Sequence, residues 1–238
     1  MSNCTVCGKV PESAFYYTMR NTVYCASHKS LIRCALCGAG GADGSRGWQQ
    51  MSPLMLRCPS CAVGAVETKA ALRAQVPSVR SGLRTLGLEL EGRVQINLAD
   101  SSELVSTCRV NNGNLLGVTS LVPDLSGQAL MASHILVLRG LPPLWFGSTA
   151  AHENMHAWLA EHGIRTPRPE IEEGLCEVVA YGWLGLQTDP LAALLRGHMK
   201  TSTDPIYGAG LREVQVLVRR YGLREVLEVL QKTGDVPQ

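Results

Sequence analysis

Two stretches decide how this chain is interpreted: His152-Glu153-Asn154-Met155-His156, and then Glu172-Glu173-Gly174-Leu175-Cys176-Glu177. The first is the HExxH pattern, which places two imidazoles four residues apart on one face of a helix. Both imidazoles can then bind one zinc ion, with Glu153 beside it as a general base. A catalytic zinc also needs a third protein ligand and an open fourth position. We predict that Glu173, in a second helix over residues 170–186, is this third ligand.

The carboxylates of the second predicted helix differ in their expected roles. Glu173 and Glu177 lie four residues apart and therefore share a face beside apolar positions. We predict that Glu177 accepts a hydrogen bond from a ligating histidine. Glu172 points about 100° away and is interpreted as a surface charge, favoured near a helix start. Cys176 is interpreted as a small buried apolar residue.

The helical context favours a metal site over the simpler interpretation, in which His152 and His156 are satisfied core histidines. Ser148 or Thr149 is expected to cap the first helix, and His162-Gly163 is expected to end it. An isolated HExxH match has a high false-positive rate. The downstream carboxylates complete a ligand set, and this makes the core-histidine alternative the weaker one.

Four further stretches accompany the two motifs: Leu138-Arg139-Gly140-Leu141-Pro142, Ala157-Trp158-Leu159, Asp204-Pro205-Ile206-Tyr207-Gly208 and Tyr221-Gly222-Leu223-Arg224. With them, residues 135–234 resemble the zinc peptidases of the gluzincin type. More narrowly, the chain is similar to the LIM-containing, ubiquitin-activated peptidases that limit organ size in plants. The ubiquitin-interacting segments of those proteins have no counterpart that we recognise in this sequence. We interpret the chain as a short relative, a bacterial origin being one option, and we do not transfer ubiquitin activation to it.

The resemblance implies an α+β fold with two parts. Residues 62–238 would form a gluzincin-like peptidase domain, with a small mixed sheet, the HExxH helix and a helical lower subdomain. Residues 1–61 would form a LIM-like module in front of it. This module would bind a protein partner or regulate the peptidase, for example by covering the active site.

The N-terminal module carries four pairs of metal-ligand residues: Cys4 and Cys7, Cys25 and His28, Cys34 and Cys37, and Cys58 and Cys61. The spacing predicts two structural zinc ions, and the simplest pairing is sequential, with two neighbouring pairs on each ion. An interleaved cross-brace remains open. Disulfides are disfavoured, because the CxxC spacing includes a histidine and the N-terminus does not resemble a signal peptide. With the HExxH site we expect three zinc ions per chain.

The module departs from a standard LIM module in two respects. Cys25 and His28 occur in the reversed order, and the link over residues 29–33 is longer than usual. These differences leave the metal sites in place but make any specific LIM partner uncertain.

Charge and hydropathy exclude other classes of partner. Residues 1–66 hold six Lys and Arg and two Asp and Glu, but seven thiolates on two zinc ions would reduce the net charge to about +1. The cations form no stripe, so nucleic-acid binding is not expected. No apolar run approaches the ~20 residues of a membrane span. We expect a soluble, cytoplasmic protein.

The remaining elements are expected as follows: a helix over 62–86 interrupted near Pro77, strands at 94–98, 105–110, 115–122 and 135–138, and a turn at 111–114. By the resemblance, the strand Ile135, Leu136, Val137 and Leu138 would be the sheet edge that aligns an extended peptide. A buried central strand fits these residues equally well.

The C-terminal third holds a candidate for stabilising the oxyanion. Tyr207 opens a predicted helix, and the resemblance implies that a Tyr or His from this region hydrogen-bonds the developing oxyanion. Tyr207 is the stronger candidate and His198 the weaker one. Simple packing of Tyr207 at a helix start is the alternative.

The sequence therefore predicts a zinc-dependent endopeptidase that hydrolyses protein or peptide substrates. Two other functions stay open: a zinc-scaffolded adaptor with a silent peptidase domain, and a zinc-finger protein of transcription. The intact Glu153 argues against the first, because a degenerate site would readily lose its general base. The low net charge of the module with zinc bound argues against the second.

Overall fold

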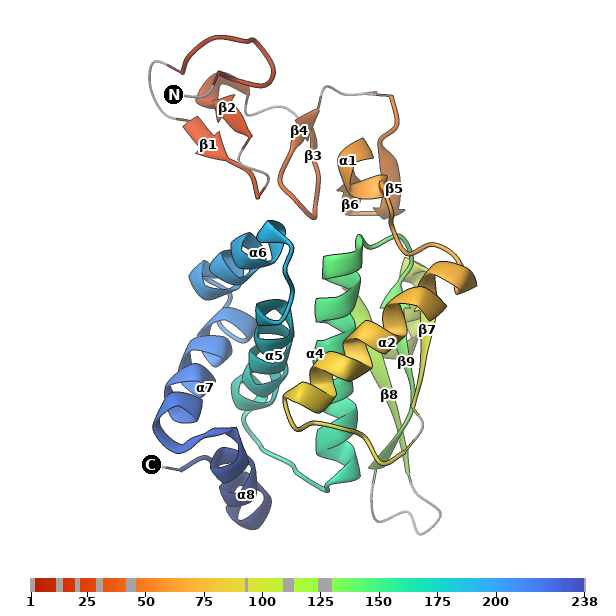
Figure 1. The fold of residues 1–238 in the computed structure, drawn as a ribbon, viewed down its shortest axis with the longest axis vertical. Coiled ribbons are helices and arrows are strands. Elements are labelled where there is room, and N and C mark those ends of the chain that lie inside the picture. The colour runs from red at the N-terminus through yellow and green to blue at the C-terminus, as the bar shows by residue number, and fades with distance from the viewer. Residues whose placement is uncertain are drawn as a thin grey trace.

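The computed structural model describes residues 3–11, 15–19, 22–28, 32–41, 46–92, 94–108, 114–123 and 130–237. The N-terminal part is built from three antiparallel two-stranded ribbons, drawn in red and orange at the top of Figure 1. Its elements are β1 (Phe15–Tyr17), β2 (Val23–Cys25), the 3-10 helix η1 (Ala26–His28), β3 (Ile32–Arg33), β4 (Gly40–Gly41), β5 (Gln49–Ser52), β6 (Met55–Arg57) and α1 (Pro59–Ala62).

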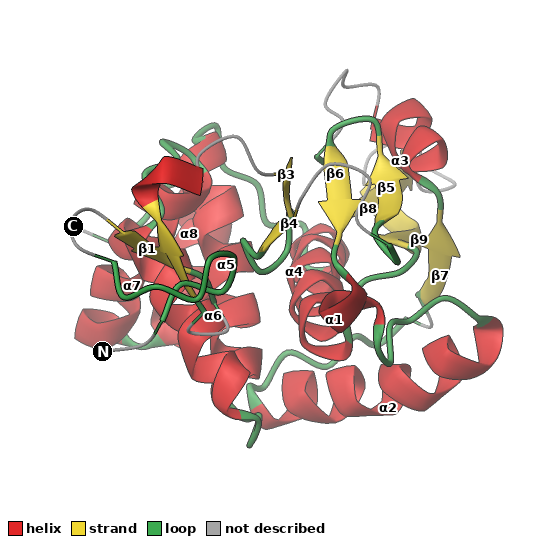
Figure 2. Cartoon of the chain, turned by 90° about the horizontal axis from the view of Figure 1, so that it is seen from above, coloured by secondary structure: helices red, strands yellow, loops and turns green. Residues whose placement is uncertain are grey.

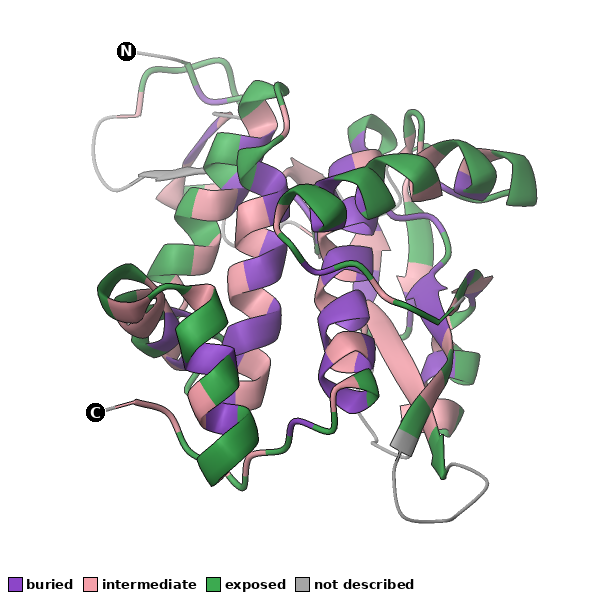
Figure 3. Cartoon of the chain, turned by 60° about the horizontal axis from the view of Figure 1, so that its bottom comes forward, coloured by how far each residue is buried: buried purple, intermediate pink, exposed green. Residues whose placement is uncertain are grey.

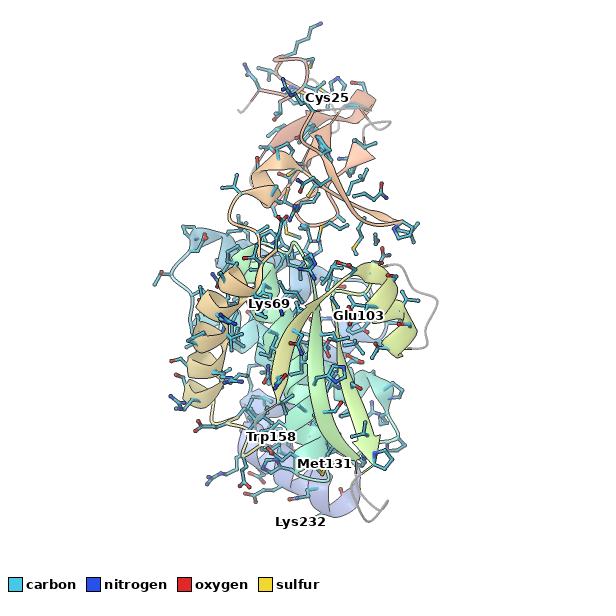
Figure 4. The ribbon with its side chains drawn as sticks, turned by 90° about the vertical axis from the view of Figure 1, so that its right-hand side faces the viewer. Cys25, Lys69, Glu103, Met131, Trp158 and Lys232 are labelled. Atoms are coloured by element: carbon cyan, nitrogen blue, oxygen red, sulfur yellow. The ribbon has the colours of Figure 1, made fainter. Side chains whose placement is uncertain are left out.

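The rest of the chain combines one small sheet with helices, as the sequence predicted for an α+β fold. Its elements are α2 (Lys69–Thr85), β7 (Gln95–Ala99), α3 (Ser101–Cys108), β8 (Gly117–Pro123), β9 (Leu130–Leu138), α4 (Pro143–Glu161), α5 (Pro169–Gly185), α6 (Pro190–Thr201), α7 (Tyr207–Tyr221) and α8 (Leu223–Thr233). Helix α4 lies between the sheet and α5, and Figure 4 shows the sheet in front of α4. No helix in the described ranges is long and apolar enough to cross a membrane.

Strand β9 is the central strand of the sheet, whose order is β7-β9-β8. It pairs in parallel with β7 and antiparallel with β8, so that Ile135 lies between Ile96 and Thr119. The prediction that residues 135–138 form a substrate-binding edge is therefore wrong. A run of branched apolar residues that is buried on both faces is typical of a central strand. Among the described residues, the edges of this sheet are β7 and β8.

Several other elements differ from their predicted bounds. Residues 101–108 form helix α3, where a strand was expected over 105–110, and residues 109–113 lie outside the described ranges. Helix α2 is continuous, with Pro77 inside it. Helix α4 begins at Pro143, because proline at the first helical position needs no backbone donor. Ser148 therefore lies within the helix, where its hydroxyl donates to the Trp145 carbonyl. The predicted end at His162-Gly163 is confirmed.

Helices α5 and α7 cross at two glycines. A Cβ atom added to Gly174 would lie 2.5 Å from the Gly210 carbonyl oxygen. One added to Gly210 would overlap the Glu170 carbonyl and the Cα atom of Gly174. The two backbones can approach this closely only because both side chains are absent. The crossing holds the start of α7 beside Glu173, the residue that precedes Gly174 on α5.

We expect Gly210→Ala to destabilise the protein by about 1–3 kcal/mol, because the added methyl group must push the two helices apart. Thermal or urea unfolding would measure this change. Gly197→Ala in helix α6 is the matched control, since nothing lies within 4 Å of its added Cβ. At that site alanine should be neutral or stabilise the helix. Equal stabilities of the two variants would contradict the close-packing interpretation.

Candidate metal centre

Helices α4 and α5 pack against each other, and buried residues run along both helices (Figure 3). His152 and His156 project from α4, one helical turn apart, and their ring centroids are 5.1 Å apart. Glu173 projects from α5 toward both. Its Oε2 atom lies 3.1 Å from His152 Nε2 and 3.6 Å from His156 Nε2. Glu173 Oε2 therefore lies close to both Nε2 atoms, and all three are ligand atoms of the types that zinc prefers.

The geometry of Glu173 fits a metal better than a hydrogen bond. Its Oε2 atom is buried and has no hydrogen-bond partner, although it lies close to both histidines. In a tetrahedral zinc site with N and O ligands at 2.0–2.1 Å, neighbouring ligand atoms are about 3.3 Å apart. The observed separations of 3.1 and 3.6 Å bracket this value. The residues present could therefore hold zinc.

The other ring nitrogens of the two histidines also meet carboxylates. Glu177 Oε1 lies 3.1 Å from His152 Nδ1, and Glu172 Oε1 lies 3.2 Å from His156 Nδ1. Such contacts fix the ring orientation and leave Nε2 free for a metal. Glu177 has the position expected from the sequence. Glu172 is partly exposed near the helix start, as expected, but its carboxylate also contacts His156, which the sequence did not predict.

The protonation states reflect this crowding of acids around two imidazoles. Burial alone lowers the pKa of His152, but Cys176, Glu173 and Glu177 together raise it well above its ordinary value. Burial raises the pKa of Glu173, but the contacts with both imidazoles outweigh it and lower this pKa to about 2. Glu173 is therefore an anion at neutral pH. The surrounding negative charge favours protonated imidazoles. A metal cation bound between these groups would take the place of those protons.

Cys176 offers a competing ligand. Its thiol is fully buried, and its Sγ lies within 4.8 Å of a ring nitrogen of each histidine. Burial raises the pKa of this thiol, which disfavours the thiolate that binds metals. Glu173 Oε2 lies 3.1 and 3.6 Å from the two Nε2 atoms and has no hydrogen-bond partner, so we prefer Glu173 as the third ligand.

The proposed general base, Glu153 on α4, is held in place by contacts with strand β8. Glu153 is only 6% exposed, and the Thr119 hydroxyl lies 2.8 Å from its Oε2 and 2.7 Å from its backbone oxygen. A Cβ atom on Gly117 would come within 2.9 Å of the Glu153 carboxyl, so glycine leaves room for it. Neither Gly117 nor Thr119 was singled out from the sequence, because the contact joins a strand and a helix that are distant along the chain.

Tyr207 lies at the start of α7, as predicted, and its ring centroid is 6.2 Å from that of His152. Asp204 fixes this helix start by accepting a hydrogen bond from the Tyr207 amide at 2.8 Å. Burial and the charges of Glu173 and Glu153 raise the pKa of Tyr207 to about 12. The phenol is therefore protonated at neutral pH and able to donate. His198, the weaker candidate, instead lines a groove between α6 and the second cysteine cluster.

The cysteine pairs of the N-terminal part form two clusters with sequential pairing, as predicted: Cys4, Cys7, Cys25 and His28 in the first, and Cys34, Cys37, Cys58 and Cys61 in the second. In the first, Cys7 and Cys25 Sγ are 3.9 Å apart. In the second, Cys37 and Cys58 Sγ are 3.7 Å apart. Two thiolates on a tetrahedral zinc are about 3.8 Å apart. Both clusters could hold zinc, and the cross-brace alternative is wrong.

Comparison with known proteins places the chain in a family. A family model described as "DA1-like: Protein DA1" matches residues 70–193, which is more than half of the chain. The chain belongs to the DA1-like family. The matched range of this DA1-like chain contains the sheet, α4, α5 and all the residues of the candidate centre except Tyr207.

Named relatives of this DA1-like chain come from plants. Protein DA1 of Arabidopsis thaliana is 36% identical over 131 residues, which cover 43% of this chain and 25% of that protein. The LIM domain-containing protein HDR3 of Oryza sativa subsp. japonica is 32% identical over 165 residues, or 54% of this chain and 33% of that protein. The chain thus spans between a quarter and a third of the length of these two relatives. No solved structure matches it.

Proposed function

We propose that this DA1-like chain is a zinc-dependent endopeptidase with a gluzincin-like active site. One observation carries the proposal: three ligand atoms from His152, His156 and Glu173 converge beside Glu153, and the Glu173 oxygen among them is buried without a hydrogen bond. A buried carboxylate oxygen without a partner is costly unless a cation compensates it. The proposal includes three zinc ions per chain, one at this centre and one in each cysteine cluster.

The residues around the centre fit peptide hydrolysis. Zinc held there would lower the pKa of a bound water and polarise the scissile carbonyl. Glu153, held by Thr119, would accept the proton of the attacking water and later deliver it to the leaving amine. Glu172 and Glu177 would hold the imidazoles in the tautomer with a free Nε2. Tyr207 would donate its phenolic hydrogen to the oxyanion.

We propose that the substrate binds along β8 and not along β9. Strand β8 is an edge of the sheet, and it contacts Glu153 through Thr119 and Gly117. An extended peptide that pairs with this edge would pass close to the general base. Main-chain pairing of this kind recognises unfolded segments with little demand on sequence.

Tyr207→Phe is expected to lower kcat by about 10²–10³-fold, which is the usual cost of removing one oxyanion donor. KM should change little, since the hydroxyl acts mainly in the transition state. Steady-state cleavage of a fluorogenic peptide would measure both constants. Tyr181→Phe is the control, because the Tyr181 ring packs against the Arg196 guanidinium and retains that contact as Phe. An unchanged kcat in Tyr207→Phe would show that Tyr207 only packs at the start of the helix and does not stabilise the oxyanion.

The proposal is tested by counting zinc and following cleavage in the same preparation. We expect three zinc ions per chain in the wild type and two in the His152→Ala/His156→Ala double variant. The wild type should cleave unstructured peptides, lose this activity to a chelator and regain it with added zinc. Fully loaded protein that cleaves no member of a broad peptide mixture would contradict the proposal and favour a zinc-scaffolded adaptor.

We further propose that a protein partner is recognised by the part of the module around the first cysteine cluster. Cys7 is exposed, and Val6 and Val10 beside it are also exposed. This surface is available for contacts, whereas the side chains of the second cluster are buried.

A further inference from the structure

The two cysteine clusters differ in what they pack against. All four cysteines of the second cluster are buried, and they belong to the same apolar core as Val66, Leu141 and Phe146. In the first cluster, Cys7 is exposed and only Cys4 is buried. Figures 1 and 2 show α1 and the β5–β6 hairpin over the N-terminal end of α4. The second cluster is thus part of the core that supports the candidate metal centre.

Arg57 connects this cluster to the rest of the fold. It ends strand β6, immediately before Cys58, and is only 3% exposed. Its guanidinium donates to the Gly140 carbonyl, to Gln49 Oε1 and to Glu67 Oε1, the last at 2.5 Å. These acceptors come from three separate segments. The planar fork of arginine can join them, whereas the single ammonium group of lysine cannot.

The burial of Arg57 is costly, which points to a specific role. Its Nε atom is buried and has no hydrogen-bond partner, so the desolvation of the group is not fully compensated. Replacing a buried ion pair by apolar side chains is often neutral or stabilising. We therefore interpret the buried arginine as a residue that fixes the relative positions of the segments it joins, more than one that adds to the stability of the fold.

The acceptor Gly140 lies in the loop that leads into α4. Its φ of +90° favours glycine, and an added Cβ would come within 2.7 Å of Arg57 Nη1. The loop is also held by Val66, which accepts from the Gly140 amide and donates to the Leu141 carbonyl, both at 2.9 Å. Pro142 and Pro143 follow directly, and their fixed φ angles make the connection to α4 stiff.

We propose that Arg57 is a positioning residue that couples the second cysteine cluster to the candidate metal centre. It fixes the loop at the start of α4, and α4 carries His152, Glu153 and His156 as one rigid element. A metal site needs its ligands within about 0.5 Å of the productive geometry, so a small displacement of this helix is enough to weaken it. The inference rests on the zinc site of the proposed function.

Arg57→Met in the otherwise unchanged chain tests the coupling. We expect the zinc of the second cluster to be retained and the dissociation constant of the zinc at the candidate centre to rise about tenfold or more, as for lost supporting contacts at other metal sites. Amide hydrogen exchange should accelerate at Gly140 and in the first turns of α4. The His152→Ala/His156→Ala variant identifies the signal of the zinc at this centre, because that ion is expected to be absent there.

Arg33→Met is the matched control. Arg33 also stands immediately before a cysteine of the second cluster, but it is exposed. Its substitution should change neither the zinc affinity nor the exchange in α4. Arg57→Lys repeats the test with the charge and most of the side-chain volume retained, which separates loss of the fork from loss of the fold. It should behave like Arg57→Met, whereas behaviour like Arg33→Met would overturn the proposal.

The measurement also separates this coupling from the proposed function. Zinc affinity and hydrogen exchange are read without catalysis. If the wild type binds the third zinc but cleaves no peptide, the endopeptidase proposal fails and the coupling can still hold. If the wild type is an active peptidase and the Arg57 variants match the control, the coupling fails alone.

Discussion

Glu153→Gln is expected to abolish peptide hydrolysis, with a loss of about 10²–10⁴-fold or more, while all three zinc ions stay bound. Glutamine keeps the size of the side chain and can still meet the Thr119 hydroxyl, which lies 2.8 Å from Oε2. It cannot accept a proton from water at neutral pH. Its carboxylate is not one of the proposed ligands and acts on His152 through its charge, so the zinc is expected to stay bound. Zinc analysis and peptide cleavage on one preparation measure both properties.

A matched control for this variant lies in the same helix. Glu161, the last residue of α4, accepts the backbone amides of Glu91 and Gly92 at 3.1 and 2.7 Å. In Glu161→Gln the amide oxygen can still accept one of these two bonds, and Glu161 lies at the far end of α4, so activity should be retained. Full activity in Glu153→Gln would remove this residue from the role of general base. Zinc loss in that variant would show instead that it supports the metal site.

Glu173→Ala is expected to reduce the zinc content from three ions to two. The variant removes the oxygen that lies 3.1 Å from His152 Nε2 and leaves two ligands, which hold zinc weakly. Elemental analysis after exchange into buffer with a weak chelator would measure the loss. Glu170→Ala is the control on the same helix, because Glu170 pairs with Arg168 at 2.8 Å and lies outside the centre.

The neighbouring side chains sharpen this test. Glu172→Ala and Glu177→Ala should weaken zinc binding about 10–100-fold without abolishing it, since each supports one imidazole through its Nδ1. If Glu173→Ala kept its third zinc and Cys176→Ser lost it, the thiol within 4.8 Å of the histidines would be the true ligand.

The second cysteine cluster changes how truncations should be designed. A deletion of residues 1–61 would remove Cys34, Cys37, Cys58 and Cys61 from the core together with Arg57. Loss of activity after such a deletion would reflect loss of this support, and it would not test whether the module covers the active site. A deletion that ends before Ile32 leaves the second cluster and Arg57 intact and is the better experiment.

The sequence alone determined the parts of this protein that depend on local spacing. Two histidines four residues apart on a helix must share a face, and so must Glu173 and Glu177. The paired cysteines likewise had to form local loops that could hold zinc, and the simplest pairing of these loops is the one observed. The helix end at Gly163 followed from the backbone freedom of glycine. These features depend on residues a few positions apart along the chain, whereas the joining of two cysteine pairs into one cluster spans 18 to 21 residues.

The tertiary structure decided what depends on contacts between distant segments. Residues 135–138 had the composition of either an edge or a central strand, and only pairing with β7 and β8 made them central. Glu172 contacts His156 because α5 packs against α4, an interaction that helical periodicity alone does not contain. The hydrogen bond of Thr119 to Glu153 and that of Arg57 to Gly140 join residues far apart in sequence. Spacing along the chain specifies which residues share a face, but only packing specifies which faces meet.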